Sequence, residues 1–191
     1  MQITGGKFRR RRLHSLPSER VRPTARRVRE TLFEMLSEEI AGARFVDLCA
    51  GSGAVGIEAL SRGALHVTFV DWSLSACDFV ELNLSVCGVG NEQRCVINSE
   101  ASRFLEEAAE SGRGPWDIAF FDPPYAVDYQ PVLALFAGGR LLRPQGLLVV
   151  EHHSDNQPEV GGYMEYLGSV ELGLTCLSLF EQMSDPLFEV Q

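Results

Sequence analysis

The sequence predicts an α/β, Rossmann-like fold: a mostly parallel seven-stranded sheet with helices on both faces, preceded by a basic N-terminal extension. From residue 44 onward, short apolar runs alternate with helical patterns, which is typical of parallel strands buried on both faces. The length of 191 residues fits about one domain. The content of 45% apolar and 23% charged residues excludes a disordered chain or a coiled coil.

The N-terminal part predicts a hairpin and a helix. Residues 3–15 are basic and could pair as a short strand or hairpin. Thr24 is a candidate helix N-cap, and Gly42 is expected to end that helix. Between them, apolar residues recur at helical spacing at Val28, Leu32, Phe33, Leu36 and Ile40.

The remaining elements follow in alternation. Strands are expected at 44–49, 66–71, 94–98, 116–122 and 146–151, and a closing antiparallel pair at 163–171 and 174–181. Helices are expected at 54–61, 74–86, 101–110 and 131–136. This gives a basic arm and helix at 1–43, a main domain at 44–183 and a loose tail at 184–191.

Charge is distributed unevenly along the chain. The net charge is −9, yet residues 1–29 contain ten of the 17 Lys and Arg residues and one of the 26 acids. A basic arm on an acidic body indicates an anionic partner for the arm. Nearly all the basic residues are arginine, whose planar fork suits bidentate contacts with phosphate. The alternative is a solvated arm, or one that folds back on its own acidic body.

Cysteine and histidine spacing favours neither a disulfide framework nor a metal site. The five cysteines are widely spaced without a C-x-x-C motif, which indicates a reducing, cytoplasmic compartment. Cys49 and Cys95 are expected in the core. His152 and His153 follow a strand and could lie near a cleft. The sequence lacks an apolar run of about 18 residues and a secretory signal at its start.

A glycine-rich segment predicts a nucleoside-binding turn. Residues 51–56 fit G-x-G-x-x-G, follow a strand and open a helix, and Asp71 ends the next strand. Asp71 would accept hydrogen bonds from ribose hydroxyls. Asp47 ends the first strand, where it would repel a pyrophosphate but suit the ammonium and sulfonium of S-adenosylmethionine. Asp47 could equally cap the turn, and the two roles are compatible.

The segment Asp122-Pro123-Pro124-Tyr125 predicts chemistry on an exocyclic amine. It lies at the carboxyl end of the fourth expected strand, where open α/β sheets bind ligands. The Asp122 carboxylate and the Pro123 carbonyl could hold both amine protons and stabilise developing positive charge. Tyr125 could stack on an unstacked or flipped base. A simple turn is the alternative interpretation.

Together, ITGGKFRRRRL, RPTARRVRETLF, DLCAGSGAVGIEAL and FFDPPY resemble the bacterial 16S ribosomal RNA guanine-N2 methyltransferases of the RsmD type, across residues 1 to about 182. The resemblance implies a class I methyltransferase fold. It also implies transfer of a methyl group from S-adenosylmethionine to guanine N2 in 16S rRNA, within a 30S subunit or assembly intermediate, by a monomer without metal.

The resemblance also implies roles for individual residues. The target base would be held by Asp122, Pro123, Pro124 and Tyr125. The cofactor would be bound by Asp47, Ala50, Gly51, Ser52, Gly53, Asp71, Trp72, Glu100 and Ala101. RNA would be contacted by Lys7, Arg9, Arg10, Arg11, Arg12, Arg22, Arg26 and Arg29.

Two departures and several alternatives stay open. Glu100 stands where relatives carry Asp or Asn, and Glu171-Leu172-Gly173 replaces an Arg-x-Tyr-Gly-like pattern. Trp72 could pack on the cofactor adenine or in the protein, and an arginine near the helix start could pair with Glu30 or another acid. Alternative functions are an adenine-N6 or other amino-methyltransferase on DNA or RNA, an NAD-dependent dehydrogenase and a non-catalytic RNA-binding protein.

Overall fold

The computed structural model describes residues 1–16, 26–124 and 128–184, which form two compact units, Met1–Glu100 and Ala101–Gln191. Thr24, Arg22, Tyr125 and most of the tail expected at 184–191 lie outside the described residues. Among the residues described, no helix is long and apolar enough to cross a membrane.

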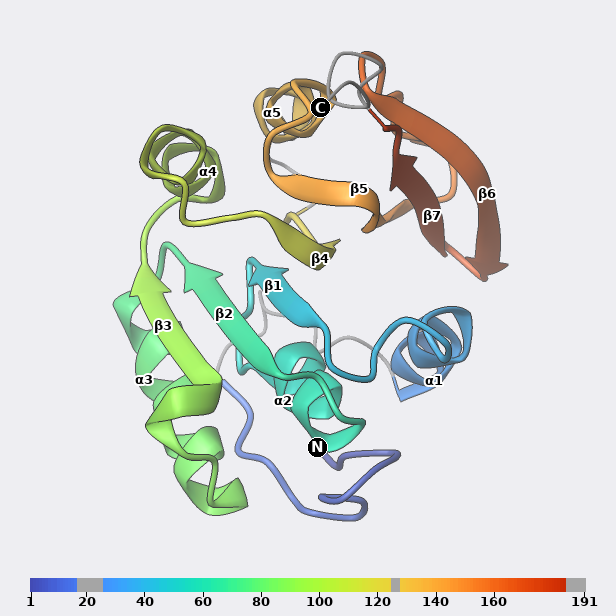
Figure 1. The fold of residues 1–191 in the computed structure, drawn as a ribbon. Coiled ribbons are helices and arrows are strands. Elements are labelled where there is room, and N and C mark those ends of the chain that lie inside the picture. The colour runs from blue at the N-terminus through green and yellow to red at the C-terminus, as the bar shows by residue number, and fades with distance from the viewer. Residues whose placement is uncertain (17–25, 125–127, 185–191) are drawn as a thin grey trace. The chain divides into compact units, whose positions relative to one another are not determined.

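The first unit is a three-stranded parallel sheet with helices. Its strands lie in the order β3-β2-β1, and Leu48 is paired with Val70 and Asp71 with Asn98. Helices α2 and α3 pack beside each other against these strands (Figure 1). The elements are α1 (Arg26–Met35), β1 (Arg44–Leu48), α2 (Ala54–Ser61), β2 (His66–Asp71), α3 (Leu74–Cys87), the 3-10 turn η1 (Asn91–Gln93) and β3 (Arg94–Asn98).

The second unit is a four-stranded sheet in the order β4-β5-β7-β6. β4 and β5 are parallel, whereas β7 is antiparallel to both β5 and β6. Its core includes the fully buried run Leu148-Val149-Val150 and a contact between the rings of Phe104 and Trp116. The elements are α4 (Ala101–Ser111), β4 (Trp116–Phe121), α5 (Gln130–Ala137), β5 (Leu142–His153), β6 (Met164–Leu172) and β7 (Thr175–Gln182).

Several expectations from the sequence need correction. Helix α1 ends at Met35 rather than near Gly42, although turns continue the chain and keep Leu36 and Ile40 buried. β5 extends beyond the expected 146–151 at both ends, because Leu142 pairs with Trp116 of β4 and β7 pairs with β5 as far as His153. Cys95 is exposed rather than in the core, since β3 is paired with β2 alone in its unit.

A buried charge network attaches both α1 and the N-terminal segment to α2. The Glu58 side chain is 0% exposed and lies 3.4 Å from Nε of Arg29, which is 2% exposed, and 2.9 Å from Nη2 of Arg62. The Thr4 hydroxyl and the Thr4 backbone amide also donate to this carboxylate. Arg29 in turn donates to the Gln2 carbonyl at 2.8 Å. One carboxylate thus joins three segments of the first unit.

We predict that Glu58→Ala lowers the free energy of unfolding by about 3–5 kcal/mol, because it breaks the buried ion pair with Arg29 by removing one partner. Urea unfolding followed by circular dichroism measures this loss. The matched control is Glu107→Ala, which removes an exposed i,i+4 partner of Arg103 and should change stability by less than about 1 kcal/mol. Equal effects of the two substitutions would contradict the network's role.

Candidate functional site: a glycine-rich turn, an Asp-Pro-Pro segment and a basic hairpin

The turn between β1 and α2 is held in an unusual backbone conformation. Cys49, Gly51 and Gly53 have φ angles of 63°, 56° and 76°, in the left-handed region. The backbone amide of Gly53 donates to the Ala50 carbonyl at 2.8 Å, and the Ala50 amide donates to the Val70 carbonyl at the end of β2. The predicted turn therefore forms at the carboxyl ends of two neighbouring parallel strands, where such sheets bind ligands.

Asp47 fixes the start of α2. Its side chain is buried, and Oδ2 accepts a hydrogen bond from the Gly56 amide at 2.8 Å. An amide in the first helical turn lacks a partner within the helix, and a carboxylate there is favoured by the helix dipole. Gly56 itself packs so closely that a Cβ would lie 2.3 Å from Cε1 of Phe69. The capping role considered for Asp47 is thus observed, and its contact with the cofactor stays a prediction.

Asp71 holds the other side of the same turn. Its Oδ2 accepts from the Gly51 amide at 2.8 Å, and its Oδ1 accepts from the Ser73 amide at 2.9 Å. The carboxylate is buried at the end of β2. Because each oxygen of an ionised carboxylate can accept more than one hydrogen bond, a ribose contact is compatible with both backbone bonds.

The remaining predicted cofactor residues differ in exposure. Trp72 is 69% exposed, so packing in the core is excluded and its ring is available to a ligand. Ser52 is buried, whereas Ala50 is half-buried. Glu100 is exposed at the end of the first unit, and Ala101 begins α4. The structure therefore brings the turn and Asp71 into direct contact and leaves the roles of Glu100 and Ala101 as predictions.

The Asp-Pro-Pro segment follows β4 directly. The strand ends at Phe121, which is paired with Val150 of β5, one residue earlier than expected. Asp122 is half-buried, Pro123 is buried and Pro124 is exposed. The proline rings restrict φ and remove two backbone donors, which leaves carbonyl acceptors in a stiff segment. The fourth member of the motif, Tyr125, is outside the described residues.

His152 joins two strands rather than facing a cleft. Its Nε2 lies 2.8 Å from the Ser178 hydroxyl on β7, and its Nδ1 lies 2.8 Å from the His153 carbonyl. Burial lowers the pKa of His152 below its ordinary value, although hydrogen bonds with the backbone of His153 and Asn156 act in the opposite direction. The imidazole is therefore neutral at physiological pH and serves as a buried link between β5 and β7.

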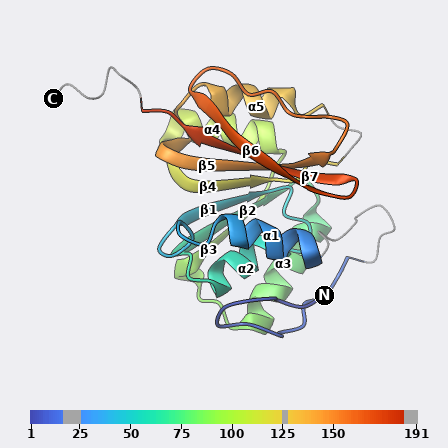
Figure 2. The ribbon, with the colours of Figure 1, turned by 90° about the vertical axis from the view of Figure 1, so that its right-hand side faces the viewer.

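The basic N-terminal segment forms a docked hairpin. Gln2 is bridged to Arg12, the Ile3 amide donates to the Arg11 carbonyl, and the side chains of Ile3 and Leu13 are buried. We call residues 1–14 the basic hairpin, whose exposed cations are Lys7, Arg9, Arg10, Arg11 and Arg12. Figure 2 shows it running beneath α2 and α3 in the first unit.

Two glycines allow the basic hairpin to approach α2. The Lys7 amide donates to the Ser61 carbonyl at 2.7 Å, and the Phe8 amide donates to the Ser61 hydroxyl at 2.8 Å. The Ser61 hydroxyl donates to the Gly5 carbonyl at 2.6 Å. A Cβ on Gly6, whose φ is 72°, would lie 1.8 Å from the Ser61 carbonyl oxygen. The segment Gly5-Gly6-Lys7-Phe8 is therefore shaped to wrap the end of α2.

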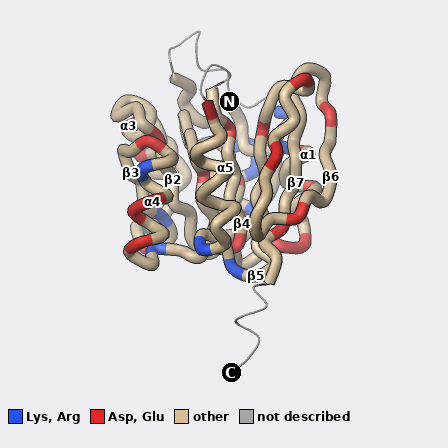
Figure 3. Tube along the Cα trace, turned by 90° about the horizontal axis from the view of Figure 1, so that it is seen from above, with Lys and Arg blue, Asp and Glu red and all other residues tan. Residues whose placement is uncertain are grey.

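Arg26 and Arg29 on α1 have intramolecular acidic partners, which is one of the two alternatives that the sequence allowed. Arg26 lies 2.9 Å from Glu30, but it is 74% exposed and remains accessible. The buried Arg29 is paired with Glu58, so a direct contact of its guanidinium with RNA is not supported; its role is to position the basic hairpin. In contrast, Figure 3 shows acidic residues along α4 and the strands β6 and β7.

Sequence reasoning missed Glu58, Arg62 and Asn83, which are among the polar side chains that fix the basic hairpin. Glu58 stands within α2, all of whose residues are buried, and this unusual setting could have identified it. The Asn83 side chain donates to the carbonyls of His14 and Ser52. Its position on α3 carries no comparable sequence signal.

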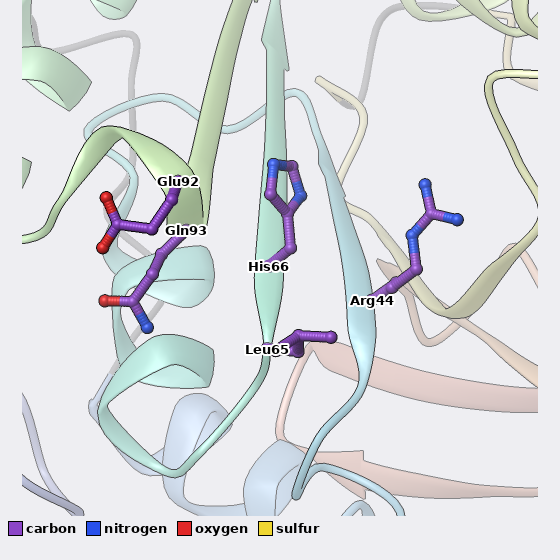
Figure 4. Close-up of a pocket in the computed structure, with 5 residues that line it drawn as sticks. All are labelled: Arg44, Leu65, His66, Glu92 and Gln93. Atoms are coloured by element: carbon purple, nitrogen blue, oxygen red, sulfur yellow. The ribbon is translucent and has the colours of Figure 1, made fainter.

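A hollow in the first unit lies at the opposite ends of the strands from the turn. It has a volume of about 560 Å³ and is lined by Arg44, Leu65, His66, Glu92 and Gln93, as Figure 4 shows. Arg44 and His66 are the first residues of β1 and β2, whereas Asp47 and Asp71 are at or near their ends. Burial and the nearby Arg44 lower the pKa of His66. We therefore do not assign this hollow to the cofactor.

Comparison with solved structures identifies the fold class of this protein. An Escherichia coli protein, yhhF, matches with a TM-score of 0.84 and 30% identity, over 97% of this chain and 99% of that one. A Thermus thermophilus protein matches with a TM-score of 0.80 and 31% identity, over 94% and 98%. The predicted Rossmann-like fold of a class I methyltransferase is confirmed.

The chain belongs to the family described as Conserved hypothetical protein 95, whose model matches residues 1–181. It is 37% identical to ribosomal RNA small subunit methyltransferase D of Escherichia coli K12 over 82% of this chain and 76% of the relative. The protein of the same name from Haemophilus influenzae is 35% identical over 81% and 80%. The family resemblance found in the sequence is thus confirmed.

We predict that Asp71→Asn weakens binding of S-adenosylhomocysteine by about 5- to 150-fold. The side-chain amide of asparagine has one acceptor oxygen, so its NH2 group would face the backbone N–H of either Gly51 or Ser73. A buried backbone donor left without its acceptor costs about 1–3 kcal/mol. Isothermal titration calorimetry measures the affinity, with Asp78→Asn on the exposed face of α3 as the matched control. Unchanged affinity in Asp71→Asn would show that Asp71 does not support the cofactor turn.

Proposed function

We propose that this protein transfers a methyl group from S-adenosylmethionine to the exocyclic N2 amine of a guanine in 16S rRNA. The relatives named ribosomal RNA small subunit methyltransferase D support a methyltransferase that acts on ribosomal RNA and uses S-adenosylmethionine. The single observation that carries the proposal is the left-handed turn fixed by Asp47 and Asp71 in a chain that retains Asp122-Pro123-Pro124. An rRNA substrate agrees with the cytoplasmic location expected from the sequence.

The turn suits the charge and shape of S-adenosylmethionine. The small residues at positions 50–53 let a ligand approach the backbone closely. Asp47 lies at the foot of the turn, where its negative charge favours the ammonium and sulfonium groups of the cofactor. Asp71, at the end of β2, would accept from the ribose hydroxyls, with the exposed Trp72 beside it for the adenine.

The Asp-Pro-Pro segment supplies what an exocyclic amine needs in order to attack. The Asp122 carboxylate and the Pro123 carbonyl would accept the two N–H groups, so that the nitrogen lone pair is directed at the methyl carbon. The nitrogen–carbon bond would form as the carbon–sulfur bond of S-adenosylmethionine breaks, with a neutral thioether as the leaving group. The positive charge would pass to the amine, which would then release its proton to solvent. Proximity and electrostatic stabilisation account for the rate.

The basic hairpin would recruit the RNA. Its five exposed cations project from a docked segment in the first unit, whereas residues 30–191 have a net charge of −18. Contacts of arginine with phosphate give affinity without sequence specificity, so the choice of base falls to the pocket that receives it. A flipped or single-stranded guanine is the form of the base that could reach such a pocket.

The substrate is tested with methyl-labelled S-adenosylmethionine offered with 30S subunits, naked 16S rRNA or duplex DNA. We expect label in 30S subunits or 16S rRNA. Label in DNA alone would support the amino-methyltransferase alternative. Absence of transfer to any substrate, with RNA still bound, would favour a non-catalytic RNA-binding protein. Calorimetric binding of NAD but not S-adenosylmethionine would favour the dehydrogenase alternative.

We predict that Asp122→Ala lowers kcat by about 100- to 1000-fold while the affinity for S-adenosylhomocysteine stays unchanged. This is the usual loss when one preorganised electrostatic contact to a developing charge is removed. Single-turnover transfer to 30S subunits measures the rate. Asp128→Ala is the matched control, since Asp128 is exposed and accepts a local hydrogen bond from the Gln130 amide. A turnover equal to that of the control would refute the role of Asp122.

We predict that replacing Arg9, Arg10, Arg11 and Arg12 with alanine weakens RNA binding and reduces its salt dependence. Each lost phosphate contact should reduce the slope of log K against log salt by about 0.7–0.9. Filter binding of a 16S rRNA transcript at several salt concentrations gives the slope. Arg103→Ala on the exposed face of α4 serves as the control. If the quadruple variant keeps the wild-type slope, the basic hairpin does not contact phosphate.

A further inference from the structure

The Asn83 side chain connects the basic hairpin to the cofactor turn. It is 0% exposed and lies on α3. Its Oδ1 accepts from the His14 amide at 2.7 Å, and its Nδ2 donates to the His14 carbonyl at 3.0 Å. The same Nδ2 donates to the Ser52 carbonyl at 2.9 Å. One carboxamide therefore uses its acceptor and both its donors on two segments that are distant in sequence.

Both ends of this link lead to functional residues. On one side, His14 is two residues after Arg12, and Leu13 between them is buried and accepts from the N-terminal amine of Met1. On the other side, the Ser52 carbonyl belongs to the peptide group that joins Ser52 to Gly53, and both Gly51 and Gly53 have φ angles in the left-handed region. The orientation of that peptide group is thus set by a side chain that also holds the basic hairpin.

A second contact connects the same two segments. The Met1 Sδ atom lies 3.9 Å from the Ser52 hydroxyl and 3.6 Å from Nη1 of Arg29. Arg29 is in turn fixed by Glu58, which binds Thr4 of the basic hairpin. A change in the position of the basic hairpin would therefore alter two contacts of Ser52, the hydrogen bond from Asn83 and the contact with Met1.

We propose that Asn83 couples RNA binding at the basic hairpin to cofactor binding at the turn, so that RNA and S-adenosylmethionine increase each other's affinity. The inference rests on the proposed function, since it takes RNA and S-adenosylmethionine as the two ligands. RNA that holds the hairpin in its docked position favours the Asn83 hydrogen bond to Ser52 and hence the binding conformation of the turn. Such coupling is reciprocal, and its usual size is about 5- to 150-fold.

The decisive variant is Asn83→Asp. It keeps an acceptor for the His14 amide, but it replaces the NH2 group that donates to the carbonyls of His14 and Ser52 with an oxygen that cannot donate. Calorimetry gives the affinity for S-adenosylhomocysteine with and without a saturating 16S rRNA transcript. We expect the transcript to increase the affinity of the wild type at least fivefold and that of Asn83→Asp less than twofold. Asn91→Ala removes an exposed asparagine contact with Arg94 in the same unit and should behave as the wild type.

If the transcript still increases the affinity of Asn83→Asp for S-adenosylhomocysteine fivefold or more, the coupling is overturned. A merely structural role of Asn83 would change the affinity with transcript and the affinity without it by the same factor, so that their ratio stays as in the wild type. If the wild-type protein binds both the transcript and S-adenosylhomocysteine but neither changes the affinity for the other, the coupling is also overturned. The proposed function is unaffected by that result. Wild type that fails to bind either ligand overturns both proposals.

Hydrogen–deuterium exchange on the wild type tests the same inference if Asn83→Asp does not fold. Adding the transcript without cofactor should slow amide exchange in a peptide covering residues 50–56 at least threefold. The hollow-lining peptide around residues 91–94 serves as the internal control and should keep its rate. An unchanged rate at 50–56 with transcript bound would overturn the coupling.

Discussion

The first unit depends on a turn that is held by buried carboxylates as well as by its own backbone hydrogen bonds. Three residues between β1 and α2 have positive φ, one of them the non-glycine Cys49. Two buried carboxylates from neighbouring strands stabilise this turn: Asp47 binds the Gly56 amide and Asp71 binds the Gly51 amide. Part of the energy that maintains the turn thus comes from groups that also give it negative charge. The same two carboxylates would favour the proposed cationic cofactor.

The second constraint is the attachment of the basic hairpin. A positively charged segment on an acidic chain could remain loosely associated, yet here buried Glu58 and Asn83 fix it by hydrogen bonds to Thr4 and His14. The ion pairs of Glu58 with Arg29 and Arg62 are shielded from water, so removing one partner is costly, unlike at the surface. Arginines such as Arg9 and Arg12 are therefore presented from a defined surface, which would reduce the entropy lost in the RNA binding proposed for them.

Much of the fold was predictable because apolar periodicity reports burial directly. The helix 54–61 and the strands 66–71 and 94–98 were placed at their observed bounds. The end of α1 was not, since Leu36 and Ile40 continue the apolar spacing through turns. In the candidate site, the glycines and the acids at the ends of strands could be recognised from the sequence. Their roles depend on their position relative to the adjacent strand and helix, which the sequence pattern shows. The partners of Arg29 and the role of Asn83 were not, because they depend on contacts between residues 29 and 69 positions apart.

The atom that receives the methyl group distinguishes the proposed reaction from its alternatives. Mass spectrometry of nucleosides from 16S rRNA, after reaction of unmodified 30S subunits with S-adenosylmethionine and this protein, identifies that atom directly. The Asp122 carboxylate and the Pro123 carbonyl are assigned to an exocyclic amine, and the family relatives act on small-subunit rRNA by name. We expect one new N2-methylguanosine per particle, absent with Asp122→Ala. N6-methyladenosine, or methylation of a ring nitrogen, carbon or ribose, would contradict the account.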